Sequence, residues 1–154
     1  MLKSRTKDLL RFFLIALVAA GSTVLLSAGP AQAAYWQPYN SNPSTWRCSD
    51  TPARISAPAH DGYFYVQACV VRNGSFIQAI EVITNTSSSA TRIFSSATVK
   101  LVNSFGAVVR TDSCPSSQLG PKLTRACFGK TLDTTDRHLA IVALDQLSDA
   151  SPLA

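Results

Sequence analysis

The amino-acid sequence predicts an all-β fold, an antiparallel β-sandwich with two disulfides. Short apolar stretches recur at spacings of roughly 8 to 12 residues. Asn, Gly, Ser and Pro fill the gaps between them, and no stretch keeps a helical period. Four cysteines accompany this pattern. Regularly spaced short strands with polar turns between them are typical of sandwiches.

The start of the chain has the three parts of a secretory signal peptide, which we assign to residues 1–33. A basic segment from Lys3 to Arg11 precedes an apolar run over 12–26, and Ala31-Gln32-Ala33 forms a small-residue cleavage site. A membrane anchor is the alternative, but the run is broken at Gly21 and is shorter than the roughly 20 residues that span a bilayer. We therefore expect a secreted, extracellular protein with no membrane attachment after cleavage.

Removal of this segment changes the charge of the chain. The formal net charge of +5 includes four of the 14 basic residues and one of the nine acidic residues from the signal, so the remaining 121 residues carry a net charge of +2. Lys and Arg are scattered singly through them, a pattern that excludes a nucleic-acid footprint. A chain of this length is one domain, large enough to bury a core.

The exported part divides into three. Residues 34–47 form an aromatic N-terminal arm, because prolines among several Asn and Ser residues disfavour regular structure. Residues 48–147 form the sandwich domain. Residues 148–154 are expected to be a flexible tail.

The centre of the sandwich is a predicted hairpin at Asn73-Gly74, a sequence that favours a two-residue turn with positive φ. This turn would pair Val70 with Ile77 and Val66 with Glu81. One side of the hairpin is then apolar apart from Glu81, and we take that side as the core. A one-residue bulge would exchange the two sides.

Further strands are expected around this hairpin, at 53–57, 93–94, 97–102, 107–111, 123–131 and 139–147. Apolar and polar residues alternate in 97–102, as in a half-buried strand. The last segment fits a strand or a short helix by periodicity, and its β surroundings favour a strand. Residues 115–122 are expected to form a loop.

The four cysteines all lie in the exported part, where oxidising conditions favour disulfides. Three pairings are possible, and we favour Cys48 with Cys69 and Cys114 with Cys127, because each pair brackets a local segment. A zinc site is the alternative, but no C-x-x-C spacing occurs and only two histidines could assist. We expect neither a metal nor a cofactor.

Three segments in the middle of the chain share motifs with a known family. Residues 83–87 read Ile-Thr-Asn-Thr-Ser, residues 97–102 alternate as a strand, and residues 106–109 read Gly-Ala-Val-Val. In these motifs the chain resembles the FxLYD-like, immunoglobulin-type domains of bacterial exported proteins, and as a whole it resembles small secreted actinobacterial proteins. The likeness covers 76–128, and both cysteine pairs and residues 103–105 depart from the family pattern. The resemblance implies an immunoglobulin-like, non-catalytic sandwich and carries over no functional residue.

No catalytic residues are predicted. The chain lacks a G-x-S-x-G motif. His60 in an Asp-Gly turn and His138 at a strand start occupy positions typical of surface or turn histidines. Glu81, the only glutamate, would need an ionic partner such as Arg92 or Arg125 on its apolar face. We therefore do not expect an enzyme.

Four aromatic side chains of the arm are the candidate binding residues: Tyr35, Trp36, Tyr39 and Trp46. Exposed aromatic rings mark binding surfaces, and these rings could stack on sugars or insert into a partner site. The alternative is that they fold back over an open edge or face of the sandwich and supply apolar area to a small domain.

These observations predict a secreted, non-catalytic binding or interaction module whose partner is an extracellular protein or a cell-surface polymer. The alternative function is a protease inhibitor that presents the loop from Cys114 to Cys127, because a disulfide-closed loop loses little entropy on docking. Leu119, Lys122 or Leu123 would then be the specificity residue.

Overall fold

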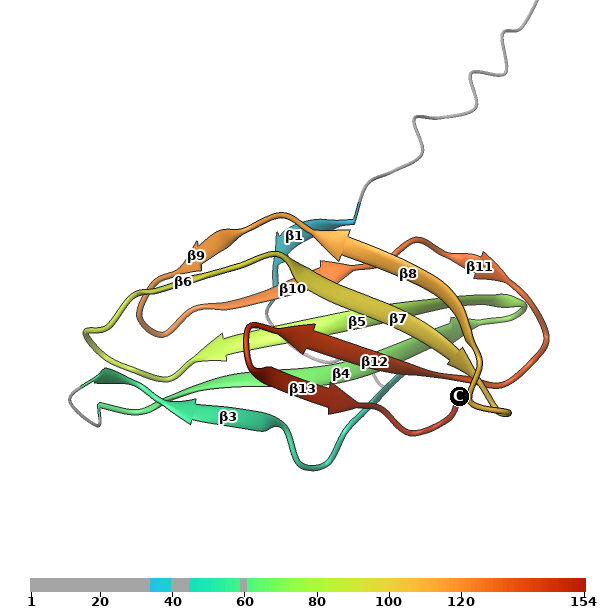
Figure 1. Cartoon of the computed structure of the whole chain (residues 1–154), viewed down its shortest axis with the longest axis horizontal. Helices are drawn as coiled ribbons and strands as arrows, with labels where there is room; N and C mark the ends of the chain where they lie inside the picture. The colour runs from blue at the N-terminus through green and yellow to red at the C-terminus, as the bar shows by residue number, and fades with distance from the viewer. Residues whose placement is uncertain (1–33, 40–44, 59–60) are drawn as a thin grey trace, which may run out of the picture. The chain divides into compact units, whose positions relative to one another are not determined.

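The computed structural model describes residues 34–39, 45–58 and 61–154. In this part of the chain the regular structure is strand, arranged as two facing antiparallel sheets and one small pair (Figure 1). No helix among these residues is long and apolar enough to cross a membrane. The all-β sandwich with two disulfides that the sequence predicts is confirmed.

The first sheet has seven strands. Its main path runs, in spatial order, through β1 (Tyr35–Pro38), β10 (Thr124–Phe128), β5 (Phe76–Asn85), β4 (Tyr63–Asn73) and β2 (Trp46–Cys48). Two further strands extend the pairing of the long central ones: β11 (Leu132–Asp133) pairs with β5, and β3 (Ala53–Ser56) pairs with β4.

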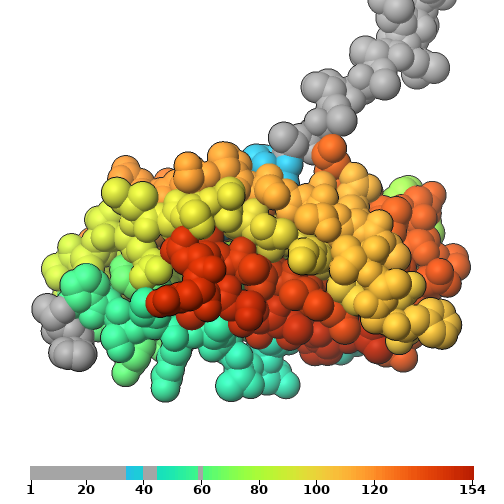
Figure 2. All heavy atoms as spheres, viewed as in Figure 1, coloured from blue at the N-terminus to red at the C-terminus, as the bar shows by residue number. Residues whose placement is uncertain are grey.

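The second sheet has four strands and faces the centre of the first. Its order is β13 (Leu147–Ala150), β12 (His138–Leu144), β7 (Ala97–Asn103) and β8 (Val108–Cys114). A separate pair joins β6 (Arg92–Phe94) to β9 (Ser117–Leu119). In Figure 2 the segment of β12 and β13, in red, lies at the centre of the face shown, and β3 borders it below. The sheets meet where β12 packs on β4 and β5, and β7 packs on β5.

The core fills the space between the two sheets. Val66 and Ile77 contribute from the first sheet, and Val99, Leu101 and Val142 from the second, each at most 2% exposed. Burying an aliphatic side chain of this size contributes about 1.5–3 kcal/mol. The alternation that places these residues on the inner faces is the period-2 pattern of their strands.

The central hairpin turns one residue later than the sequence predicts. Gly74 and Ser75 are the two turn residues, Asn73 pairs with Phe76, and Val70 faces Ala79 instead of Ile77. Gly74 has φ 61° and Asn73 does not have a positive φ, so glycine stands at the first central position, as in a type II′ turn. The predicted core side is still the inner side, because a register change of two residues leaves every side chain on its face.

The outer side of this hairpin is buried as well. Cys69, Ile80 and Val82 are at most 4% exposed and form a second cluster with Ala126 of β10. Aromatic residues pack over this cluster on the outside of the sheet. The sandwich therefore has a third layer, formed by side chains alone.

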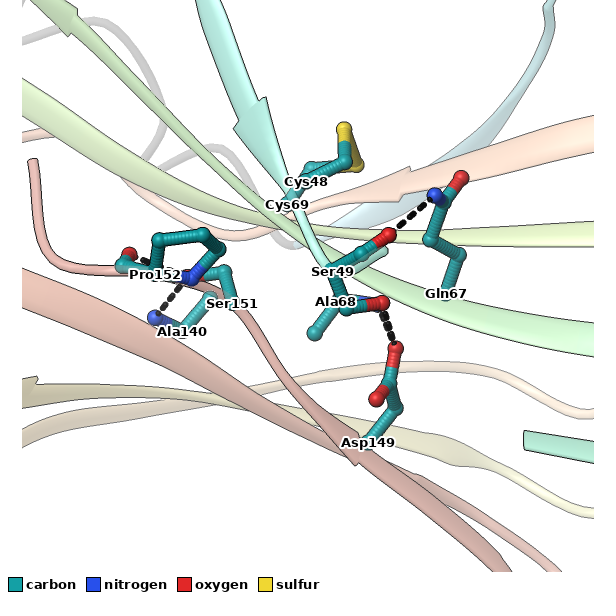
Figure 3. Close-up of a disulfide and its surroundings, with 9 residues drawn as sticks. All are labelled: Cys48, Ser49, Gln67, Ala68, Cys69, Ala140, Asp149, Ser151 and Pro152. Atoms are coloured by element: carbon teal, nitrogen blue, oxygen red, sulfur yellow. Dashed lines mark hydrogen bonds between the residues drawn. A yellow bond between two sulfur atoms is a disulfide. The ribbon is translucent and has the colours of Figure 1, made fainter. Parts of the chain in front are cut away.

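Both disulfides have the pairing that the sequence favours. Cys48 and Cys69 are directly opposite each other on β2 and β4 (Figure 3). Cys114 on β8 joins Cys127 on β10 and so links the second sheet to the first. In the chain-entropy model each closed loop contributes about 3 kcal/mol.

Two segments that we expected outside the strands belong to them. Within the predicted aromatic arm, residues 34–47, the described parts 34–39 and 45–47 are extended, but β1 pairs with β10 and β2 pairs with β4, so these parts belong to the first sheet. The predicted loop 115–122 contains β9, whose partner is β6. The short strands escaped prediction because distant partners hold them, whereas their own three or four residues carry little signal.

The C-terminal segment also differs from the prediction. The expected strand 139–147 ends at Leu144, and Asp145, with φ 52°, turns the chain into β13. The expected tail 148–154 therefore pairs with β12, and its last residue, Ala154, exchanges two backbone hydrogen bonds with His138. Asp145 stabilises its own turn, since its carboxylate accepts hydrogen bonds from the Ser95 amide and from Arg92.

The Asp149 carboxylate accepts a hydrogen bond from β4 at a point where neither β2 nor β3 pairs with that strand. Between the stretches of β4 that pair with β2 and β3, the Ala68 amide donates to Asp149 Oδ2 of β13 at 2.8 Å, and Ser49 Oγ donates to the same oxygen (Figure 3). Gln67 Nε2 donates to the Ser49 carbonyl oxygen at 2.8 Å. Asp149 thus ties the second sheet to the edge of the first.

Replacement of Asp149 by Ala should lower the free energy of unfolding by about 1–3 kcal/mol, because the buried Ala68 amide loses its acceptor. Urea unfolding followed by fluorescence measures this change. Asp133→Ala, which removes an exposed carboxylate from β11, is the matched control and should change stability by less than about 0.5 kcal/mol. Equal stability of both variants would contradict this role of Asp149.

Candidate functional site

The aromatic arm is divided between the two faces of the first sheet. In β1, Tyr35 is opposite Phe128 of β10 and Trp36 is opposite Cys127. Because successive side chains point to opposite faces, Tyr35 and Gln37 lie on the outer side, and Trp36 points inward. Two neighbouring aromatic residues in the sequence therefore have different surroundings.

Trp36 is a packing residue. Its Nε1 donates a hydrogen bond to the Pro115 carbonyl oxygen at 2.8 Å, and its ring meets Phe94 edge-on with ring centres 5.1 Å apart. It packs against the inner core cluster. Trp36 therefore fits the alternative expectation, that the aromatic rings of the arm fold back on the sandwich and supply apolar area.

Tyr39 and Trp46 come together on the outer face. Their rings are stacked with centres 5.2 Å apart, and Trp46 meets Phe128 edge-on at 5.7 Å. The three rings cover the outer cluster of Cys69, Ile80, Val82 and Ala126. Burial raises the pKa of the Tyr39 hydroxyl, which has no hydrogen-bond partner among the described residues. The rings of Tyr39, Trp46 and Phe128 are thus partly buried and cover the outer cluster, and Phe128 is opposite Tyr35 of β1.

An open recess of about 360 Å³ lies beside this aromatic layer. Its volume is within the range of roughly 300–1,000 Å³ that is usual for small-ligand sites. The residues that line it are Tyr35, Gln37, Gln78, Arg110, Phe128, Gly129, Lys130 and Thr131. Of the predicted binding residues, only Tyr35 lines this recess, and its side chain is 44% exposed.

The backbone that follows β10 forms a fixed wall of the recess. The Gly129 amide donates to the Ala79 carbonyl oxygen at 3.0 Å, and Gln78 Nε2 donates to the Gly129 carbonyl oxygen at 2.5 Å. A Cβ at position 129 would lie 3.2 Å from both the Ala79 oxygen and Asp112 Oδ2, so glycine allows this close approach. These hydrogen bonds therefore fix the position of the backbone that forms this wall of the recess.

One carboxylate, that of Asp112, holds both basic residues of the recess in place. Asp112 Oδ2 accepts hydrogen bonds from Arg110 Nε at 3.0 Å and from the Lys130 amide at 2.8 Å. Arg110 Nη1 also lies 3.4 Å from the Thr131 carbonyl oxygen. The residues that line the recess include two basic residues and no acidic one.

The histidines form no catalytic group within the described part of the chain. His138, expected at the surface, is 2% exposed, because the C-terminal residues fold over the start of β12. Its Nδ1 is 2.9 Å from the Asp136 carbonyl oxygen. His60 lies outside the described residues. No cluster of three His, Cys, Asp or Glu side chains suitable for a metal occurs among the residues that the structure describes.

Glu81 lacks the ion pair that we expected. It is fully buried, and neither carboxyl oxygen has a hydrogen-bond partner in the described residues. The two candidate partners are engaged elsewhere: Arg92 lies 3.1 Å from Asp145, and Arg125 Nη1 donates to Ser117 Oγ at 3.0 Å. Burial, aided by the negative charge of Asp145, raises the pKa of Glu81 to about 9.

The pKa of a second carboxylate, that of Asp61, is shifted in the opposite direction. Asp61 accepts hydrogen bonds from the side chains of Ser89, Ser87 and Ser88, and from the Ser88 and Ser89 amides. These bonds hold the pKa of Asp61 well below its ordinary value, with the Ser89 hydroxyl as the largest cause. The polar segment that follows β5 is therefore a structural turn around one carboxylate, stabilised above the pKa of an unfolded Asp and weakened as the pH falls.

The segment proposed for protease inhibition is largely held against the domain. Leu119, in β9, is 2% exposed and belongs to the core. Lys122 Nζ donates to the Thr86 carbonyl oxygen at 2.6 Å. Of the three predicted specificity residues, Lys122 and Leu123 are exposed, Leu123 at 48%.

Replacement of Trp36 by Ala should lower the free energy of unfolding by about 3 kcal/mol, as expected for loss of a large packed ring and its hydrogen bond. Urea unfolding measures the loss. Tyr35→Ala, from the adjacent exposed position, is the control and should cost less than about 1 kcal/mol. A fully stable Trp36→Ala variant would show that Trp36 does not support the core.

Replacement of Glu81 by Met should stabilise the protein at pH 7.5 by about 1–3 kcal/mol, because it removes a buried, unpaired polar group. The folded state keeps the Glu81 proton up to about pH 9, whereas the unfolded chain releases it near pH 4.5. The stability of the parent should therefore fall as the pH rises between these values.

Thermal unfolding of the parent and of Glu81→Met from pH 4 to 9 tests this pH dependence. The difference in melting temperature between them should grow with pH. A difference that is constant over this range would mean that Glu81 does not hold a proton in the folded protein.

The chain was compared with models of protein families, with curated proteins and with solved structures. No family model matches it, and neither of the other two comparisons gives a match. The resemblance to FxLYD-like domains stays a prediction, and function is argued from the geometry of the site.

Proposed function

We propose that the protein is a secreted, non-catalytic binding module that holds a cell-surface polymer on the outer face of its first sheet. The signal peptide predicted at residues 1–33 supports export, and the two disulfides are compatible with an oxidising compartment. The binding surface is the recess together with the layer of Tyr39, Trp46 and Phe128 beside it.

The observation that carries this proposal is the composition of the recess. The rings of Tyr35 and Phe128 stand beside the amide groups of Gln37 and Gln78 in one concave surface. Aromatic rings offer an apolar face to the carbon side of a sugar ring, and amides donate to and accept from its hydroxyl groups. Concave sites with a few placed polar groups are typical of ligand binding.

The same composition favours binding over catalysis. A hydroxyl nucleophile needs an adjacent base, and glycoside hydrolysis needs two apposed carboxyl groups. The lining residues contain neither a histidine nor a carboxylate. The proposed site therefore has groups that position a ligand and lacks those that would transform it.

Co-sedimentation of the purified protein with insoluble cell walls, chitin and cellulose tests this function. The parent should be found in the pellet with at least one of these polymers. Tyr35→Ala should bind about fivefold less tightly, since loss of an aromatic stacking contact costs about 1 kcal/mol.

Tyr63→Ala is the matched control, because Tyr63 is a tyrosine of similar exposure, 38% against 44%, that does not line the recess. It should bind as the parent does. Binding that is insensitive to Tyr35→Ala, or equally reduced in both variants, would contradict the assignment of the recess. Absence of the parent from every pellet would contradict polymer binding itself.

A further inference from the structure

We propose that the recess selects glycans whose sugar rings carry carboxylates, with Lys130 and Arg110 as the charge-reading residues. This inference rests on the proposed function and names its ligand class. Tyr35 and Phe128 would bind the ring, and the two cations would bind the acid group.

The first argument is the charge balance of the recess. Arg110 and Lys130 both line it, and the nearest counterion is Asp112, which does not line it. Within the described residues the ion pairs are Arg92 with Asp145 and Arg110 with Asp112. Lys130 therefore has no carboxylate partner there, and the recess keeps a net positive charge that an anionic ligand would balance.

The second argument is which hydrogen-bonding groups of Arg110 and Lys130 are already engaged within the protein. Asp112 binds Arg110 through Nε and Lys130 through its backbone amide, so it fixes both residues without using the lysine ammonium. Arg110 Nη1 is 3.4 Å from the Thr131 carbonyl oxygen, and Nη2 has no partner among the described residues. One guanidinium nitrogen and one ammonium remain as donors, and charge-assisted hydrogen bonds to carboxylates are among the stronger ones in proteins.

The third argument separates an acidic glycan from other anions. The exposed ring of Tyr35 and the half-buried ring of Phe128 favour a ligand with a ring, which a chain of polyol phosphates lacks. A single-stranded nucleic acid also combines rings with charge, but its recognition uses a basic groove that tracks the backbone. The exported chain has a net charge of only +2, with its basic residues scattered singly.

The test compares two oligosaccharides of the same sugar sequence, one with free carboxylates and one with the carboxylates masked as neutral methyl esters. The probes are oligogalacturonate and the same oligosaccharide with its carboxylates methyl-esterified, each titrated into the purified protein by calorimetry. The parent should bind the acid form at least about tenfold more tightly, and raising the salt concentration should weaken that binding while leaving the ester unaffected.

Lys130→Gln should lower the affinity for the acid form about fivefold and leave the affinity for the ester unchanged. Lys100→Gln is the matched control: it removes the same charge at a residue of β7 that does not line the recess, and should change neither affinity. Unchanged melting temperatures establish that both variants are folded.

Each other outcome overturns the inference. Equal binding of acid and ester, or equal losses in the Lys130 and Lys100 variants, would remove charge selection and leave a neutral-glycan module intact. A single-stranded oligonucleotide bound more tightly than oligogalacturonate would assign the recess to nucleic acid. If neither oligosaccharide binds but the protein sediments with a neutral polymer, this inference fails alone. If it sediments with none, the proposed function fails with it.

Discussion

The long pairing of β4 with β5 is the constraint on which the rest of the structure depends. Its central residues are buried on both sides, from Val66 and Ile77 inside to Cys69 and Ile80 outside. The second sheet covers the inner side. The outer side needs another cover, and it obtains one from aromatic side chains of β2, β10 and residue 39. Residues 35–39 and 46–48 are therefore part of the domain, because a two-sided apolar sheet cannot leave one side open to water.

Local alternation made the strands and the core face predictable, and long-range contacts set what the sequence did not reveal. The inner residues of β4 and β5 could be identified because a period of two survives a register error of two residues. Strand β9 could not, since its pairing with β6, as between Leu119 and Arg92, joins distant segments. The turn at Asp145 lacks the Asn-Gly or Asp-Gly signal and is stabilised by Arg92 and Ser95 from elsewhere in the chain.

The candidate site was predictable only in part, for the same reason. Aromatic composition pointed to residues 34–47, but the division between Trp36 inside and Tyr35 outside depends on pairing with β10. Gln78, Arg110 and Lys130 read as ordinary surface residues in the sequence, and three separate strands or turns bring them together. The one available signal was the order Tyr35, Trp36, Gln37. In a strand this order places Trp36 on the buried face and the other two residues on the solvent-exposed face.

Two aspartates, Asp145 at a turn and Asp112 in β8, decide which charges remain unpaired. Asp145 engages Arg92 to stabilise the hairpin of β12 and β13, and so the buried Glu81 has no cation and keeps a proton instead. Asp112 engages Arg110 and the Lys130 backbone, and so the Lys130 ammonium is left without a carboxylate. The difference between Glu81 and Lys130 is that Glu81 is fully buried. An unpaired carboxyl in the core can only be neutralised by protonation, whereas Lys130 lines an open recess, where we propose that it meets an anionic ligand.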